Sequence, residues 1–173
     1  MRWLLLVICA SGCEGLDRIP IVVGTEDDPC APEREEEVAC TLDGDTFQVG
    51  ACGGESVRLL GVSAPEIAHD ESETDECWGP EAATWLDDLL VGVTVRLSFD
   101  AVCEDTYERT LAYAWIDESV DGEEESRLVN EEIIRAGYAR VYEDFDDIRL
   151  ADRLYEAEAA AQEENLGLWA VCE

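Results

Sequence analysis

The chain has 173 residues, 47% of them apolar, which is typical of a single globular domain with one core. It carries 43 Asp and Glu residues against 11 Arg and no Lys, for a net charge of −32. Such a surface repels polyanions unless salt or bound cations screen it, so it argues against an unscreened nucleic-acid ligand; the same charge also suits a solvated shell in salty surroundings.

The N-terminus predicts export. Arg2 precedes an apolar run, Trp3 to Ala10, that is too short to span a bilayer. The run continues into Ser11-Gly12-Cys13, which resembles a bacterial lipoprotein box in which the Cys13 thiol is lipidated. We therefore expect residues 1–12 to be a lipoprotein signal peptide and the protein to be exported to the cell envelope, on the periplasmic side or at the cell surface. The alternative is an ordinary leader with a fortuitous Cys.

Beyond Cys9 and Cys13, an even number of cysteines remains, which predicts three disulfides in an exported chain. Fifteen pairings are possible, and the spacing does not choose among them. No two cysteines have the C-x₂-C spacing and the chain has one His, so a zinc site is disfavoured. The cysteines concerned are Cys30, Cys40, Cys52, Cys77, Cys103 and Cys172.

Residues 13–35 contain three prolines, scattered Gly and an acidic run, with little periodic apolar content. This composition is typical of a tether, so we expect a lipid-anchored linker here and a folded domain over residues 36–173.

The folded part opens with short strands. Residues 38–42 and 46–49 flank Asp43-Gly44, a dipeptide suited to a tight hairpin, and residues 57–62 predict a third strand. Gly79-Pro80 then opens a helix, because Pro suits the first turn, where a missing N–H costs nothing. Apolar residues at helical spacing continue to Gly92, which ends the helix.

The second half of the chain alternates at first and then turns helical. Residues 93–99 alternate apolar and polar side chains, as in a half-buried strand, and a further strand begins at Leu111. Helices are predicted over about 128–136 and 147–164. The whole predicts an α+β fold, a five-stranded OB-fold Greek-key β-barrel with three α-helices. Closure of the barrel would remove exposed sheet edges.

Three segments resemble the staphylococcal nuclease (thermonuclease) family. They are Asp43-Gly44-Asp45-Thr46, the R-x-x-x-V-x-x-P-E stretch of residues 58–66, and the D-x-Y-x-R-x-L-A-Y stretch of residues 105–113. Each motif is weak alone, but their order and spacing hold across about residues 38–170. Supporting matches lie at residues 79–82, 129–137 and 166–169.

The resemblance implies hydrolysis of nucleic-acid phosphodiesters. Arg58 and Arg109 would clamp the phosphate, since planar guanidiniums bind it bidentately. Glu66 would be the general base that orients and deprotonates the attacking water. Tyr107 and Tyr142 would contact the bound nucleotide. The expected substrate is single-stranded DNA or RNA, and the expected protein is a monomer.

The same resemblance implies a Ca²⁺ site, a hard ion that takes oxygen ligands. Asp45 would bind it directly, Ala64 would offer its carbonyl, and Asp43 would lie behind Asp45. The family usually carries an Asp at the position of Ser63, whose hydroxyl can coordinate but brings no charge. Weaker Ca²⁺ binding is expected, because affinity follows ligand charge.

Two functions are compatible with these residues. The first is a Ca²⁺-dependent endonuclease of the cell envelope, favoured by Arg58, Glu66 and Arg109. The second is a catalytically weak or inactive OB-fold binding module on a lipid anchor, favoured by Ser63 and the net charge of −32.

Overall fold

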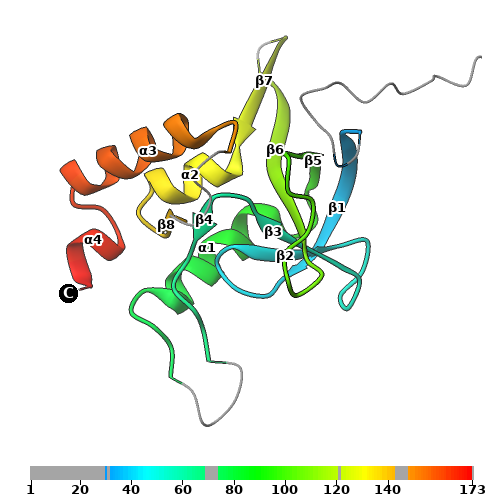
Figure 1. Cartoon of the computed structure of the whole chain (residues 1–173). Coiled ribbons are helices and arrows are strands. Elements are labelled where there is room, and N and C mark those ends of the chain that lie inside the picture. Colours follow the sequence, from blue (N-terminus) through cyan, green and yellow to red (C-terminus); the bar gives the residue numbers. More distant parts are fainter. Residues whose placement is uncertain (1–29, 31, 69–73, 121, 143–147, 173) are drawn as a thin grey trace, which may run out of the picture.

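The structure is a computed structural model and describes residues 30, 32–68, 74–120, 122–142 and 148–172 (Figure 1). Residues 1–12 and Cys13, predicted as signal peptide and lipidation site, lie outside the described residues. The first strand begins at Arg34, two residues before the predicted start of the domain. None of the helices in the described part of the chain has the length and apolarity needed to span a bilayer.

Five strands form a closed barrel, as predicted. They follow the order β3-β2-β1-β5-β6 with antiparallel pairing, and a parallel pairing of β3 with β6 closes the ring. Alternate side chains of these strands fill the interior, where Val38, Phe47 and Val95 are fully buried. The barrel strands are β1 (Arg34–Thr41), β2 (Thr46–Val49), β3 (Glu55–Leu59), β5 (Thr94–Ser98) and β6 (Thr110–Val120).

The strand predicted over 57–62 is interrupted, and this corrects the expectation. β3 ends at Leu59, and Gly61 turns the chain with a φ of 77° that favours glycine. The chain then forms β4 (Val62–Ser63), which pairs with β8 (Arg140–Val141) outside the barrel. The turn therefore moves the second half of the predicted strand away from the barrel wall and toward the helices.

A further strand, β7 (Glu123–Leu128), was not expected. It pairs with β6 in a long hairpin that projects beyond the barrel (Figure 1). Most of its side chains are exposed, so its sequence, Glu-Glu-Glu-Ser-Arg-Leu, needs no alternation of apolar and polar residues and shows none. Its backbone hydrogen bonds with β6 make it a strand. Because it has no buried face, the sequence carries no apolar pattern that would predict it.

The three predicted helices are present as α1 (Gly79–Leu90), α2 (Val129–Arg135) and α3 (Ala151–Glu163), followed by a single turn, α4 (Leu168–Val171). α1 buries Ala82, Leu86 and Leu90 and begins at Gly79-Pro80 as expected. The last predicted helix starts at residue 151 instead of 147, and residues 143–147 lie outside the described residues. α3 and α4 lie on the side of α2 away from the barrel (Figure 1).

Asn130 joins the barrel seam to the helices. Its side chain is fully buried at the start of α2. Its amide nitrogen donates to the carbonyls of Leu60 (2.9 Å) and Ala112 (3.2 Å), and its oxygen accepts from the Ala114 N–H (2.9 Å). These bonds satisfy backbone groups at the β3–β6 seam, where the Ala112 carbonyl also accepts the Leu60 N–H (2.9 Å).

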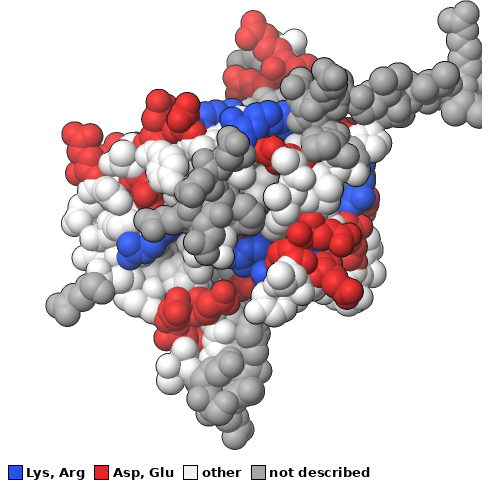
Figure 2. Space-filling model, in the orientation of Figure 1, with Lys and Arg blue, Asp and Glu red and all other residues white. Residues whose placement is uncertain are grey.

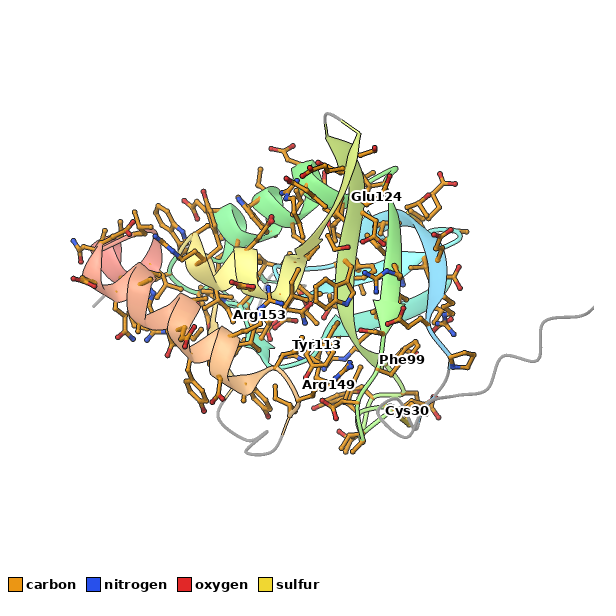
Figure 3. All side chains as sticks on the ribbon, turned by 90° about the horizontal axis from the view of Figure 1, so that it is seen from above. Cys30, Phe99, Tyr113, Glu124, Arg149 and Arg153 are labelled. Atoms are coloured by element: carbon orange, nitrogen blue, oxygen red, sulfur yellow. A yellow bond between two sulfur atoms is a disulfide. The ribbon has the colours of Figure 1, made fainter. Side chains whose placement is uncertain are left out.

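A second polar network anchors the segment before α3. Tyr113 is buried on β6 and its hydroxyl donates to Asp100 (2.8 Å), while the N–H of Arg149 donates to the same carboxylate (2.7 Å). Burial, with the Asp100 hydrogen bond, raises the pKa of Tyr113. The Arg149 guanidinium lies 5.4 Å from the Tyr113 ring, beside Phe99 and Cys30 (Figure 3).

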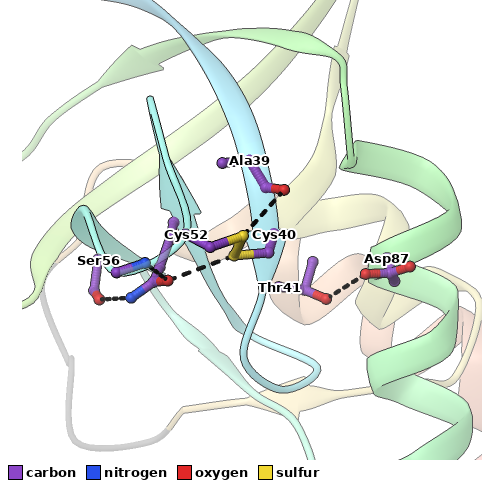
Figure 4. Close-up of a disulfide and its surroundings, with 8 residues drawn as sticks. Ala39, Cys40, Thr41, Cys52, Ser56 and Asp87 are labelled. Carbon is purple, nitrogen blue, oxygen red and sulfur yellow. Dashed lines mark hydrogen bonds between the residues drawn. A yellow bond between two sulfur atoms is a disulfide. The ribbon is translucent and has the colours of Figure 1, made fainter.

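The six cysteines form three disulfides, as predicted. Cys30 pairs with Cys103 and Cys77 with Cys172, closing sequence separations of 73 and 95 residues. The third bond joins Cys40 on β1 to Cys52 in the turn before β3 (Figure 4). Next to it, the Thr41 hydroxyl donates to Asp87 (2.8 Å) and connects β1 to α1.

Candidate active site

A buried carboxylate lies at the centre of the site. Asp45 is 1% exposed, just before β2. Its Oδ1 accepts hydrogen bonds from Arg58 Nη1 (2.8 Å) and the Thr46 hydroxyl (2.9 Å), and its Oδ2 accepts from the Ala64 N–H (3.1 Å). Arg58 reaches it because it lies directly opposite Thr46 in the β2–β3 pair, on the same face. This carboxylate therefore fixes the first predicted guanidinium.

Asp43 adds a second negative charge behind Asp45. It is also buried, and its Oδ1 accepts the Asp45 N–H (2.9 Å). Burial and then the charge of Asp43 raise the pKa of Asp45 to about 7, against the lowering effect of Arg58. Two adjacent buried carboxylates with one ion-paired guanidinium leave negative charge that a cation would compensate.

Gly44 explains how this turn fits. A Cβ at residue 44 would meet the Cβ atoms of Ala64 and Ala82 at 2.7 and 2.8 Å. The turn thus packs directly against α1 and against the residue that follows β4, and glycine is needed for this close approach and not for its φ. The packing sets the position of Asp43 and Asp45 relative to Ala64.

The second guanidinium comes from a tight loop before β6. Arg109 donates from Nε to Asp105 Oδ2 (2.6 Å), while Asp105 Oδ1 accepts the N–H groups of Tyr107 (2.8 Å) and Arg109 (3.0 Å). Burial opposes ionisation of Asp105, but these hydrogen bonds outweigh it and lower its pKa. Glu108 completes the turn with a φ of 62°. Asp105 therefore holds both the loop and the guanidinium.

Thr46 connects the two halves of the site. Arg109 Nη1 donates to the Thr46 hydroxyl (3.4 Å), which itself donates to Asp45. The two guanidiniums thus belong to one hydrogen-bonded chain that runs from Asp105 through Arg109, Thr46 and Asp45 to Arg58.

The predicted catalytic and substrate-binding residues, with Ser63, line one cavity of about 320 Å³, whereas Asp43, Asp45 and Ala64 do not line it. The Arg58 guanidinium lies 5.8 Å from the Tyr142 ring and that of Arg109 lies 5.3 Å from the Tyr107 ring, which is 78% exposed. Each cation is thus flanked by an aromatic face on one side and a carboxylate on another. The cavity is lined by Arg58, Ser63, Glu66, Asp105, Thr106, Tyr107, Arg109, Leu111 and Tyr142.

Glu66 is exposed at this cavity, and the start of α1 positions its backbone. Its N–H donates to Glu76 Oε2 (3.2 Å), and its carbonyl accepts the Glu76 N–H (2.9 Å). A Cβ at Gly79 would meet the Glu66 carbonyl oxygen at 2.5 Å. Glycine at the first position of α1 is therefore what allows the Glu66 segment to lie against the helix.

The donor set around Asp45 fits a hard cation with few charged ligands. In the described ranges, no group of three or more His, Cys, Asp or Glu side chains is placed to hold a metal ion. The oxygen atoms near this point are the Asp45 carboxylate, the Ser63 hydroxyl at the cavity wall and the Ala64 carbonyl, with Asp43 behind; Ala64 itself contacts Asp45 through its N–H. All are oxygen donors, the ligands that Ca²⁺ prefers, but they carry little charge.

Charge elsewhere on the surface opposes anions. Figure 2 shows that on one face the Arg side chains form small separate groups between larger acidic areas. Most described Arg residues are ion-paired, as Arg96 is with Asp117 and Glu33. A bound polyanion would therefore contact small groups of Arg side chains and not a broad basic patch.

Two residues that organise the site were not singled out in the sequence. Thr46 and Asp105 both lie in the matched motifs, but no role was assigned to either. The i, i+4 spacing of Asp105 and Arg109 was a usable signal, because this spacing supports an ion pair across one turn. The bridging role of Thr46 depends on the β2–β3 register, which the sequence alone does not give.

Comparison with known proteins agrees with this geometry. The sequence profile described as "Staphylococcal nuclease homologue" matches residues 56–171. The chain belongs to the staphylococcal nuclease family. The family match covers Arg58, Glu66 and Arg109, whereas Asp43 and Asp45 lie before its start.

Individual relatives extend the likeness toward the N-terminus. The chain is 30% identical to a thermonuclease of Staphylococcus hyicus over 140 residues, covering 80% of this chain and 78% of the relative. It is 32% identical to a thermonuclease of Staphylococcus intermedius, covering 74% and 71%. It is also 33% identical to a probable endonuclease of Aspergillus flavus, but there it spans 43% of the longer protein.

The buried carboxylate pair predicts a pH-dependent stability in the presence of a chelator. Because the pKa of Asp45 is raised from 3.8 to about 7 in the folded state, folding is favoured by protonation. Its contribution is greatest below the unfolded pKa and is lost as the pH rises through about 7. Asp45→Asn should remove this decline, which amounts to a few kcal/mol at most, on the order of 1.4 kcal/mol per unit of pKa shift.

The measurement is the free energy of unfolding from urea titrations between acidic and neutral pH. Asp88→Asn, which replaces an exposed carboxylate on α1, is the matched control and should follow the wild type. Parallel pH curves for wild type and Asp45→Asn would contradict the assignment.

Proposed function

We propose that this protein is a nuclease that hydrolyses phosphodiester bonds of DNA or RNA with the help of Ca²⁺. The observation that supports it is the convergence of Arg58, Arg109 and Glu66 on one cavity beside a buried carboxylate. Membership of the staphylococcal nuclease family and the thermonuclease names of its relatives support the same chemistry.

The two guanidiniums suit a phosphate that gains negative charge as water attacks it. One edge of each guanidinium is ion-paired with a carboxylate, Arg58 with Asp45 and Arg109 with Asp105. Both side chains also line the cavity. Fixed donors of this kind stabilise developing charge without reorganising, and removing one typically costs about 10²–10³ in rate. Tyr107 and Tyr142 would contact the nucleotide at the cavity rim.

Glu66 would act as the general base. It lines the same cavity as both guanidiniums and is exposed to solvent, so water reaches it. A carboxylate in this position can orient a water molecule and accept its proton as the oxygen attacks phosphorus.

Ca²⁺ would be held by Asp45, by the Ser63 hydroxyl and by the Ala64 carbonyl, with Asp43 behind them. When bound, the ion would supply electrostatic polarisation of the phosphate and compensate the negative charge of the two aspartates. The charge-poor donor set supports weak binding, so activity should need millimolar metal.

The decisive experiment compares the wild-type domain with Glu66→Gln on single-stranded DNA and RNA, with Ca²⁺ or with chelator. We expect cleavage that needs the metal and falls by about 10²–10⁴-fold in the variant. Tyr155→Phe, a change on the exposed part of α3, serves as a control that should keep full activity. Binding of the oligonucleotide without cleavage at any Ca²⁺ concentration would instead support the binding-module alternative.

Ser63→Asp should strengthen the metal site. An added carboxylate restores ligand charge, so the Ca²⁺ concentration for half-maximal activity should fall by about 10–100-fold. Isothermal titration of the metal-free domain with Ca²⁺ measures the same effect without turnover. An unchanged Ca²⁺ requirement in this variant would count against a metal site at Ser63.

We also propose that the protein is a lipoprotein of the cell envelope, anchored through Cys13. The lipoprotein-box sequence and the three disulfides support export. In cells fed radiolabelled palmitate, the wild-type chain should carry label in the membrane fraction. Cys13→Ser should carry none; label retained by this variant would refute the anchor.

A further inference from the structure

A second cavity, of about 460 Å³, adjoins the candidate active site. Ser63 and Tyr142 line both cavities, so the two share a wall. On its other side the second cavity is lined by Arg140 of β8 and by Trp169 of α4. Figure 1 places β4 and β8 between the barrel and the pair α3–α4.

Arg140 is aimed toward this region by strand pairing. It lies directly opposite Ser63 in the antiparallel β4–β8 pair, so both side chains project from the same face. Its guanidinium lies 4.2 Å from the centroid of the Trp169 ring. Stacking on an indole fixes the plane of a guanidinium while its N–H edge stays available for an anion.

Among the described residues, no carboxylate forms an ion pair with Arg140. In the described part of this strongly acidic chain, Arg34, Arg58, Arg96, Arg109, Arg127, Arg135 and Arg153 each form an ion pair. Arg140 forms none with a described residue. Glu158, the acidic residue in the cavity wall, is engaged by the Val141 N–H (2.8 Å). The cavity therefore presents a stacked cation next to the site where phosphate chemistry is proposed.

We propose that the second cavity binds the neighbouring nucleotide of a polynucleotide chain, with Arg140 holding its phosphate and Trp169 supporting the guanidinium. The inference rests on the proposed nuclease function and adds a direction: the substrate passes from Arg109 across Ser63 and Tyr142 to Arg140. Arg140 is a substrate-binding residue here and takes no part in bond cleavage.

The test compares Arg140→Ala with the wild type on two substrates in Ca²⁺, a dinucleotide with one phosphodiester and an oligonucleotide of about ten nucleotides. We expect kcat/KM for the oligonucleotide to fall about tenfold, the effect of one charge-assisted hydrogen bond. The value for the dinucleotide should be unchanged. The slope of log kcat/KM against log salt should also become shallower by about 0.7 on the oligonucleotide.

Arg135→Ala is the matched control. It removes the same charge from a surface Arg that pairs with Glu164 and lines neither of the two cavities. Thermal melting checks that each variant folds, and Arg140→Gln replaces Arg140→Ala if the latter does not. Equal losses on both substrates, no loss on either, or the same loss in Arg135→Ala would overturn the inference.

These outcomes are separate from failure of the proposed function. A wild-type protein that cleaves neither substrate refutes the nuclease proposal. A wild-type protein that cleaves both, with an Arg140→Ala variant that behaves identically, leaves the nuclease proposal standing and refutes the second nucleotide site.

Discussion

The carboxylate of Asp45 is the interaction on which the site depends. It is buried at the end of the β1–β2 turn and contacts the side chain of Arg58, the hydroxyl of Thr46 and the backbone of Ala64. Through Thr46 it also reaches Arg109. A buried carboxylate is costly in free energy, and the nearby charge of Asp43 adds to the cost. The hydrogen bonds from Arg58, Thr46 and Ala64 offset part of this cost. They also bring three parts of the chain together at one point.

The scaffold around that carboxylate is held by close backbone contacts and by buried amide bonds. Gly44 and Gly79 each occupy a place where a Cβ would collide with a neighbouring element. Asn130 joins the β3–β6 seam to α2, at the end of the strand that carries Arg58. Movement at these contacts would shift the guanidiniums and Glu66 together, since they belong to one packed unit.

The sequence predicted the barrel because its strands follow from local patterns, whereas the site residues were implied by the resemblance of three motifs to a known family. Residues 93–99 alternate as a half-buried strand should, and the motif containing Arg109 lies in a loop where side-chain spacing reflects turn geometry. The elements that escaped prediction lack such a pattern. β7 is acidic and mostly exposed, β8 has two residues, and α4 is a single turn. The break after Leu59 occurs at Gly61, which has a φ of 77°. A Cβ there would also meet the Leu154 side chain of α3 at 2.6 Å, a tertiary contact that the sequence does not reveal.

The role of Thr46 could not be deduced for a related reason. Its hydroxyl lies between Asp45, the preceding residue, and Arg109, which is 63 residues further along the chain. The pairing of β2 with β3 and of β3 with β6 brings Arg109 to it. The pairing of the cysteines also depends on which segments the fold brings together. Fifteen pairings satisfy the sequence, and the barrel selects one of them.

Two of those cross-links close large loops of the chain, with sequence separations of 73 and 95 residues. Cys30 is joined to Cys103, beside the loop that carries Arg109, and Cys172, which follows α4, is joined to Cys77, just before α1. A segment that opens locally at either cross-link stays tethered to its partner, so its return is an intramolecular step. A proteolytic cut within either of these loops would accordingly leave the two pieces covalently joined.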